Sequence, residues 1–287
     1  MIRRSTFGLF GFIALATGAV ALAASAIVAG PMPASAQDAS YGYGQADGGG
    51  FSLGVGGMVG IKPKYEGSDE YEAFGFPVVF PKFGGNDLGG RVKVRGADDV
   101  RFKLFEAGGF EIGPLAGYAF GRDEDDGDLL RGLGDVDDGL VLGAYAGYHV
   151  GPVLFDVSYH QIVTGDDDGY QIRFGAEVNT AFSASWRGTA RVGTTFADDN
   201  YTDSYFGITR AQSLSSAAGL GAYDADAGIK DVHLELGLTW DVTDRWQLKS
   251  GFRYGRLVGD AADSPIVESE DQFSALLGAT YTFDVQR

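Results

Sequence analysis

The chain has 287 residues, 46 of them glycine, and its 39 Asp and Glu outnumber 22 Lys and Arg, which gives a formal net charge of −17. That charge argues against a nucleic-acid-binding protein, which needs a basic face, and the lack of cysteine excludes disulfide scaffolds and thiolate metal sites. The glycines follow no G-X-Y repeat, which excludes collagen, and an aromatic content of 13% is too high for a disordered chain.

The first 36 residues have the pattern of a cleaved secretory signal peptide. A short positive region precedes an apolar stretch over 7–28, and the segment closes on prolines and the small-residue site Ala34-x-Ala36. The apolar stretch is also long enough to anchor the chain in a bilayer, which is the alternative interpretation. We expect cleavage between Ala36 and Gln37, and therefore export of the mature chain.

The polar, glycine-rich residues 37–50 are expected to form a flexible periplasmic leader, and from residue 51 onward apolar residues recur at every second position. That period indicates β-strands with one apolar and one polar face. The clearest example is 231–242, in which the even-numbered positions are all apolar and the odd-numbered ones are polar or glycine. A second such run, 245–258, follows after only two residues, so the two predict a hairpin.

Twelve segments follow this pattern, and each is about as long as a tilted strand that crosses a bilayer core. The third and fourth are the least regular, and ten strands remain without that hairpin. Either number is even, as single-chain bacterial outer-membrane barrels require. The predicted strands cover 51–62, 73–82, 87–95, 99–106, 109–120, 140–150, 153–164, 169–181, 184–196, 231–242, 245–258 and 271–283.

The connections between these strands differ in length on the two sides of the predicted sheet. Those expected on the periplasmic side have four residues or fewer, whereas the outer connections cover 63–72, 96–98, 121–139, 165–168, 197–230 and 259–270. A soluble β-sandwich, the alternative fold, has no reason to sort its loops in this way. We therefore expect an all-β protein, a transmembrane antiparallel up-and-down β-barrel over 51–283, with a C-terminal tail at 284–287.

One of the long connections, 197–230, carries a helix signal. Thr209 and Gln212 have the spacing of a capping box, in which each side chain satisfies a free backbone N–H at the start of a helix. We predict a short helix there. It either plugs the mouth of the barrel or only shortens a long loop.

Charged side chains on the polar face of the strands must point into the barrel, because the apolar face meets lipid. The structural interpretation is a filled interior held rigid by ion pairs, and the functional one is a narrow path for a polar or anionic solute. The candidate interior charges are Arg91, Lys93, Arg101, Arg173, Glu177, Arg187, Arg191, Glu235, Lys249 and Arg253.

Acidic residues gather in the predicted outer loops. One cluster lies at 166–168, and neither cluster has the spacing of a calcium-binding loop. A solvated acidic loop is the simpler interpretation, and weak divalent-ion bridging to lipopolysaccharide phosphates is the alternative. The larger cluster comprises Asp123, Glu124, Asp125, Asp126 and Asp128.

The sequence contains no P-loop, HExxH, GxSxG or spaced His/Cys metal motif, so we expect no catalytic, cofactor-binding or metal-binding residues. Asp156, Ser158 and His160 share the polar face of one predicted strand, which superficially resembles a hydrolase set. Neighbours on a strand face stand about 6.6 Å apart, too far for a direct hydrogen bond between a nucleophile and its base. A hydrolase is therefore the least favoured function.

Several segments, in order along 51–283, resemble the MipA/OmpV family (MltA-interacting protein, outer membrane). Such chains commonly end on a terminal aromatic residue, whereas this chain continues past Phe283. The segments that carry the resemblance are P-K-Y-E-G-S at 63–68, the loop 121–135, S-Y-F-G-I-T at 204–209, A-Y-D-A at 222–225, G-I-K-D at 228–231 and L-V-G-D-A-A-D-S-P-I-V at 257–267.

The resemblance implies a non-enzymatic barrel in the outer membrane of a Gram-negative bacterium, placed there by the barrel-insertion machinery and surrounded by lipid and lipopolysaccharide. Namesake members are described as scaffolds that join a lytic transglycosylase to a murein synthase. Our first hypothesis is therefore a scaffold for peptidoglycan enzymes in cell-envelope maintenance. The alternatives are a small-solute channel or uptake pore with a basic interior and a surface adhesin.

Overall fold

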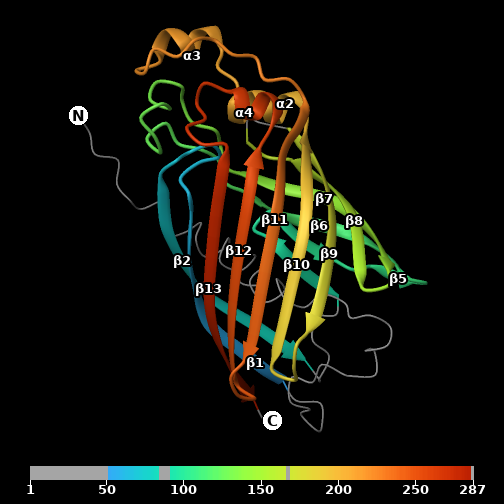
Figure 1. The fold of residues 1–287 in the computed structure, drawn as a ribbon. Coiled ribbons are helices and arrows are strands. Elements are labelled where there is room, and N and C mark those ends of the chain that lie inside the picture. The colour runs from blue at the N-terminus through green and yellow to red at the C-terminus, as the bar shows by residue number, and fades with distance from the viewer. Residues whose placement is uncertain (1–50, 84–90, 166–168, 286–287) are drawn as a thin grey trace.

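A computed structural model shows one antiparallel sheet that curves into a barrel (Figure 1). The structure describes residues 51–83, 91–165 and 169–285. Its long strands are β1 (Phe51–Pro63), β2 (Tyr71–Phe83), β6 (Phe110–Ala119), β7 (Gly139–Val150), β8 (Val153–Ile162), β9 (Tyr170–Ala181), β10 (Trp186–Ala197), β11 (Gly228–Asp241), β12 (Trp246–Leu257) and β13 (Asp271–Val285). Three further strands are short: β3 (Val92–Gly96), β4 (Asp99–Phe102) and β5 (Phe105–Ala107).

The order of the strands is that of an up-and-down barrel. From β6 to β13 each long strand pairs with the next one along the chain, and β1 pairs with both β2 and β13. The β1–β13 ladder sets Phe51 opposite Val285, so the first and last strands lie side by side. Within the described ranges, no helix has the length and the hydropathy that a membrane-crossing helix needs.

The predicted third and fourth strands differ most from the structure. Of the predicted strand 87–95, residues 87–90 lie outside the described residues, Arg91 is in a turn and β3 begins at Val92. The predicted strand 99–106 is divided into β4 and β5. The β3–β4 hairpin is buried on both faces: Val94 and Val100 on one side and Lys93 and Arg101 on the other are less than 9% exposed. Its strands are short, and apart from Phe102, which is 42% exposed, they lack the exposed apolar face of a lipid-facing strand.

The sorting of the connections by length agrees with the prediction. Figure 1 shows the helices and long loops at one end of the barrel and tight turns at the other. At the loop end the connections are 64–70, 120–138, 198–227 and 258–270, and at the turn end β7–β8, β9–β10 and β11–β12 are joined by two to four residues. The predicted outer connection 165–168 lies mostly outside the described residues.

The loop-end connections pack into one structure, the loop cap, which comprises 64–70, 120–138, 198–227 and 258–270. It contains α2 (Asp199–Phe206), α3 (Arg210–Ser215) and α4 (Gly259–Asp263). The capping box predicted at Thr209 and Gln212 is confirmed at the start of α3. However, no α3 residue is buried, and it is α2 and α4 that lie against the barrel (Figure 1).

Apolar side chains from all four cap segments hold the cap together. Tyr65, Leu130, Leu133, Ile208 and Ile266 form one buried cluster, although they come from loops up to 201 residues apart. A second cluster joins α2 and α4 to the barrel wall through residues that include Tyr205, Phe206, Ala261, Val141 and Leu257. Burial of this apolar area stabilises long loops that would otherwise be mobile.

We predict that Phe206→Ala opens the cap and leaves the barrel folded. Phe206 is 0% exposed, and truncation of a buried phenylalanine costs about 3–5 kcal/mol. Limited proteolysis of the purified protein should therefore cut within 198–227 much faster, while heat-modifiable mobility on a gel is retained. Leu214→Ala is the matched control, since Leu214 is 87% exposed. Equal cleavage rates for the two variants would contradict the described packing of the cap.

Candidate functional site

The long strands present an apolar face outward and a polar face inward. On β11, Leu234, Leu236 and Trp240 are 36–44% exposed, whereas Asp231 and Thr239 are 4% and 0% exposed. The same alternation recurs on β7 and β8. A membrane-spanning strand needs this arrangement, since hydrocarbon solvates only the apolar face.

Ten charged side chains meet inside the barrel in a set that we call the interior ion network. It has five bases and five acids, so its formal charges cancel. They come from the β3–β4 hairpin and from the wall strands β6, β8, β9 and β10, so the network joins the hairpin to the wall across the interior. Its members are Lys93, Arg95, Arg101, Arg173, Arg191, Asp98, Asp99, Glu111, Asp156 and Glu177.

Asp156 of β8 is the centre of this network. Its side chain is 0% exposed, and its Oδ1 accepts from Nη1 of Arg101 at 2.8 Å while its Oδ2 accepts from Nη1 of Arg191 at 2.5 Å. Arg101 also donates to both carboxylate oxygens of Asp99, at 2.8 and 2.9 Å. Arg95 reaches Glu177 of β9 at 2.5 Å. Bidentate, charge-assisted bonds of this kind are short and hold both partners in one geometry.

Glycine makes room for the network. A Cβ on Gly175 of β9 would lie 2.0 Å from Nη2 of Arg191, so the guanidinium occupies the space that any larger residue would fill. Gly193 of β10 does the same for His233, whose Nε2 would lie 2.4 Å from the added Cβ. The high glycine content of the chain therefore serves, at these positions, to admit large charged side chains into the interior.

The structure brings together many but not all of the predicted interior charges. Arg187 pairs with Asp241 at 3.0 Å, nearer the turn end, and Lys249 is buried on β12. Arg91 does not belong with them, because it is exposed and precedes β3. Those that lie in the network are Lys93, Arg101, Arg173, Glu177 and Arg191, while Glu235 and Arg253 lie in a separate cluster near the cap.

Sequence reasoning missed two network acids, Asp98 and Asp99. Asp98 lies at the tip of the β3–β4 hairpin, in the predicted outer connection 96–98, and Asp99 begins β4, as it began the predicted strand 99–106. The tip faces the interior and not the outer surface. Asp98 pairs with Arg173 of β9. The sequence did hold a signal for an interior position of this hairpin. Arg95, Asp99 and Arg101 place charges of both signs on one short hairpin, and such charges are rarely exposed to lipid.

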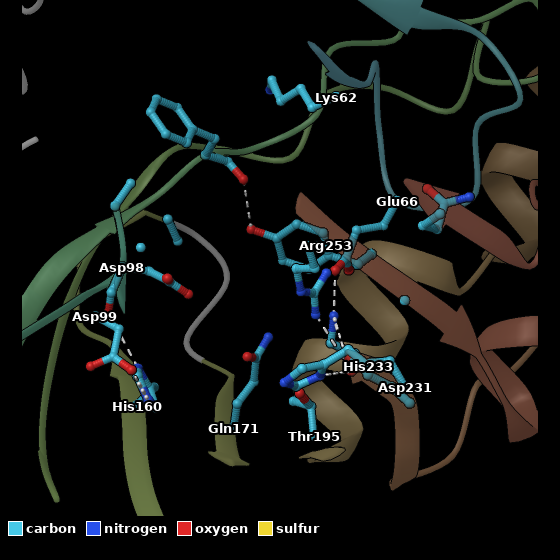
Figure 2. A pocket seen from close by; sticks show the side chains of 18 of the residues that line it. Lys62, Glu66, Asp98, Asp99, His160, Gln171, Thr195, Asp231, His233 and Arg253 are labelled. Atoms are coloured by element: carbon cyan, nitrogen blue, oxygen red, sulfur yellow. Dashed lines mark hydrogen bonds and ion pairs between the residues drawn. The ribbon is translucent and has the colours of Figure 1, made fainter. Parts of the chain in front are cut away.

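Between the network and the cap lies a cavity of about 420 Å³. Figure 2 shows Asp98, Asp99 and His160 on one side, Asp231, His233 and Arg253 on the other, and Gln171 and Thr195 between them. The side that belongs to β11 and β12 carries a second charged group, which we call the mouth cluster. It comprises Glu66, Lys230, Asp231, His233, Glu235 and Arg253.

The mouth cluster fastens the cap to the wall. Lys230 of β11 pairs with Glu66 of the 64–70 loop and lies 5.3 Å from the centre of the Tyr201 ring. The Tyr201 hydroxyl donates to Glu66 at 3.3 Å. Burial, followed by the nearby Glu66 carboxylate, raises the pKa of Tyr201 well above its ordinary value, so the hydroxyl stays a neutral donor.

Ser158 and His160 correct one sequence inference. The Ser158 Oγ lies 2.9 Å from Nε2 of His160, because the two side chains lean toward each other along β8, so the argument from strand spacing was wrong. The nearest carboxylate, Asp99, lies 3.8 Å from the same nitrogen, and Nδ1 faces the carbonyl oxygen of Asp98 at 3.3 Å. Ser158 is 1% exposed and accepts from Arg101, so it serves the network and is sealed from solutes.

The acidic loop at 123–128 uses several of its carboxylates for its own backbone. Glu124 accepts from the N–H groups of Gly132 and Gly134, and Asp126 accepts from that of Asp123. Burial and the neighbouring carboxylates raise the pKa of Asp123. Within the described ranges no group of His, Cys, Asp and Glu has the arrangement of a metal site. The second predicted acidic cluster, 166–168, lies outside the described residues.

We predict that Asp156→Asn lowers the stability of the barrel strongly. The change leaves buried guanidinium groups without their shared carboxylate, and breaking a buried ion pair from one side costs about 3–5 kcal/mol. Urea unfolding in detergent, followed by gel mobility, measures the loss. Asp128→Asn is the control, because the Asp128 side chain is 90% exposed and its bond to Arg131 is solvated. A similar shift for both variants would contradict the role of Asp156.

Comparison with known proteins finds relatives of low sequence identity. The chain is 25% identical over 177 residues to the outer membrane protein Omp26La of Vibrio anguillarum, and 27% identical over 173 residues to the outer membrane protein OmpV of Vibrio cholerae. Each alignment covers 59% of this chain and 63% of the relative, so the chain spans less than two thirds of their length. Among solved structures, the outer membrane channel DcaP of Acinetobacter baumannii is 11% identical, with a TM-score of 0.35, over 83% of this chain and 96% of that one.

The family model described as MltA-interacting protein MipA matches residues 55–283, which reach every long strand and include the whole loop cap. The segments that resemble the family meet in the cap, where Tyr65 donates to the carbonyl of Ile266 and Ser264 bonds to that of Phe206. The chain therefore belongs to the MltA-interacting protein MipA family, and it is a β-barrel protein of the bacterial outer membrane.

Proposed function

We propose that this protein is a closed, non-enzymatic outer-membrane barrel that serves as a scaffold for peptidoglycan-remodelling enzymes. One observation carries the proposal: the interior ion network joins the β3–β4 hairpin to the wall strands β6, β8, β9 and β10 through side chains that are mostly buried. A barrel filled in this way is rigid and leaves little room for solute flux, which suits a fixed membrane anchor.

The partner is inferred from the family description. That description names an interaction with MltA. The class of partner, a lytic transglycosylase and a murein synthase, follows from the role described for namesake members of the family. Export by cleavage between Ala36 and Gln37, with residues 37–50 as a periplasmic leader and 284–287 as a tail, belongs to the same proposal. These segments lie outside the described residues, except for Asp284 and Val285 of β13.

We expect murein enzymes to copurify with the tagged protein from native outer membranes solubilised in mild detergent. Mass spectrometry of the bound fraction measures this, and an unrelated barrel with the same tag is the control. The N-terminus of the purified chain, read in the same spectra, should be Gln37. If no murein enzyme is enriched over the control, the scaffold role is contradicted, whatever the state of the barrel.

A channel is the second candidate, and the cavity beneath the cap is the observation that favours it. The two functions differ in what removal of the cap should do. A scaffold with a sealed interior should not conduct after residues 198–227 are replaced by a short linker, because the ion network lies below the cap. Planar-bilayer recordings test this. A steady conductance in the shortened variant, absent from the full chain, would identify a gated pore instead.

A further inference from the structure

Some of the charged side chains that line the cavity beneath the cap are within reach of solvent. At the centre of the interior ion network, the side chains of Asp156, Arg101 and Asp99 are 0%, 1% and 4% exposed. Two of the ion pairs that line the cavity are more open: the side chains of Arg173 and Asp98, at the edge of the network, and of Arg253 and Glu235 are 22–40% exposed. The centre of the network therefore has little hydrogen-bonding capacity left, whereas these two pairs retain donors and acceptors that a small solute can use.

These accessible charges come as one pair of opposite sign on each of two walls. On the first wall, Arg173 of β9 pairs with Asp98 at the tip of the β3–β4 hairpin. On the second wall, Arg253 of β12 lies opposite Glu235 of β11 in the ladder, and its Nε is 3.5 Å from the Glu235 carboxylate. Each wall thus offers a guanidinium beside a carboxylate, and on the second wall Asp231 is a further carboxylate, 3.6 Å from Nη2 of Arg253.

This pairing discriminates between classes of ligand. An anion that approaches either guanidinium also approaches a carboxylate, and a cation that approaches either carboxylate meets a guanidinium, so an ion of one sign gains little on both walls. A molecule that carries both signs makes charge-assisted hydrogen bonds at both members of a pair. Such bonds are about twice as strong as those that a neutral hydroxyl makes.

The volume and the roof of the cavity fit a small polar solute. About 420 Å³ lies in the lower part of the range of ligand sites, which is about 300–1,000 Å³. Tyr201 and Tyr205 of α2 line the cavity on the cap side, with ring centroids 4.3 Å apart. Their rings limit contact with bulk water, which strengthens electrostatic bonds to a bound molecule.

We propose that this cavity binds a small zwitterion of the amino-acid type, whose carboxylate accepts from a cavity arginine and whose ammonium group donates to a cavity carboxylate. The binding site is distinct from the scaffold role and does not depend on it. Binding of a zwitterion explains why these ion pairs are accessible, since ion pairs with a purely structural role could be fully buried.

The test is isothermal titration calorimetry of the full-length protein in detergent with a matched set of probes. L-Alanine carries both charges, propionate lacks the ammonium group, ethylammonium lacks the carboxylate, and glucose is polar without charge. We expect saturable binding of L-alanine, at least about tenfold tighter than that of any other probe, because each single ion loses one charge-assisted bond. No saturable binding of L-alanine, or equal binding of propionate, ethylammonium or glucose, would overturn the proposal.

Two variants locate the site. Arg253→Gln and Glu235→Gln should each weaken L-alanine binding about tenfold, and both residues lie outside the interior ion network, so the barrel should stay folded by gel mobility. Arg256→Gln is the control on the same strand, because Arg256 pairs with Glu270 and Asp271 and does not line the cavity. Unchanged affinity in the first two variants, or the same loss in the control, would place the binding elsewhere and refute the assignment.

Discussion

The buried carboxylate of Asp156 is the constraint on which much of the interior depends. A charge taken out of water is costly unless it is paired and hydrogen-bonded, and this one is shared by guanidinium groups of β4 and β10, with Arg95 of β3 at 3.8 Å. Because those bases come from a hairpin and from the opposite wall, their pairing fixes where the hairpin lies. The hairpin in turn occupies part of the interior and lines one side of the cavity.

The loop cap covers the cavity and is stabilised mainly by apolar contacts. Its four segments are held by apolar clusters and by one fastening between Lys230, Glu66 and Tyr201. The interior resists opening because charges would lose their partners, whereas the cap resists opening because apolar side chains would meet water. Most of the segments that resemble the family lie in this cap.

Much of the fold was predictable from the sequence because a lipid-exposed strand has little freedom in its pattern. The alternation in 231–242 placed the faces of β11 correctly, and the spacing of Thr209 and Gln212 placed α3. The β3–β4 hairpin was not predictable in the same way, since neither of its faces meets lipid and its alternation carries no membrane signal. The contacts within the site were not predictable for a related reason: Asp98 and Arg173 are 75 residues apart in the sequence, and only the folded sheet brings them together.

Ion pairs across the interior hold the hairpin to the wall. A double-mutant cycle on Arg95 of β3 and Glu177 of β9, which lie 2.5 Å apart, measures that link most directly. With Arg95→Gln and Glu177→Gln, the account predicts a coupling free energy of about 1–3 kcal/mol in unfolding experiments, well above that of the exposed pair Arg131 and Asp128. A coupling no larger than that of the exposed pair would contradict it.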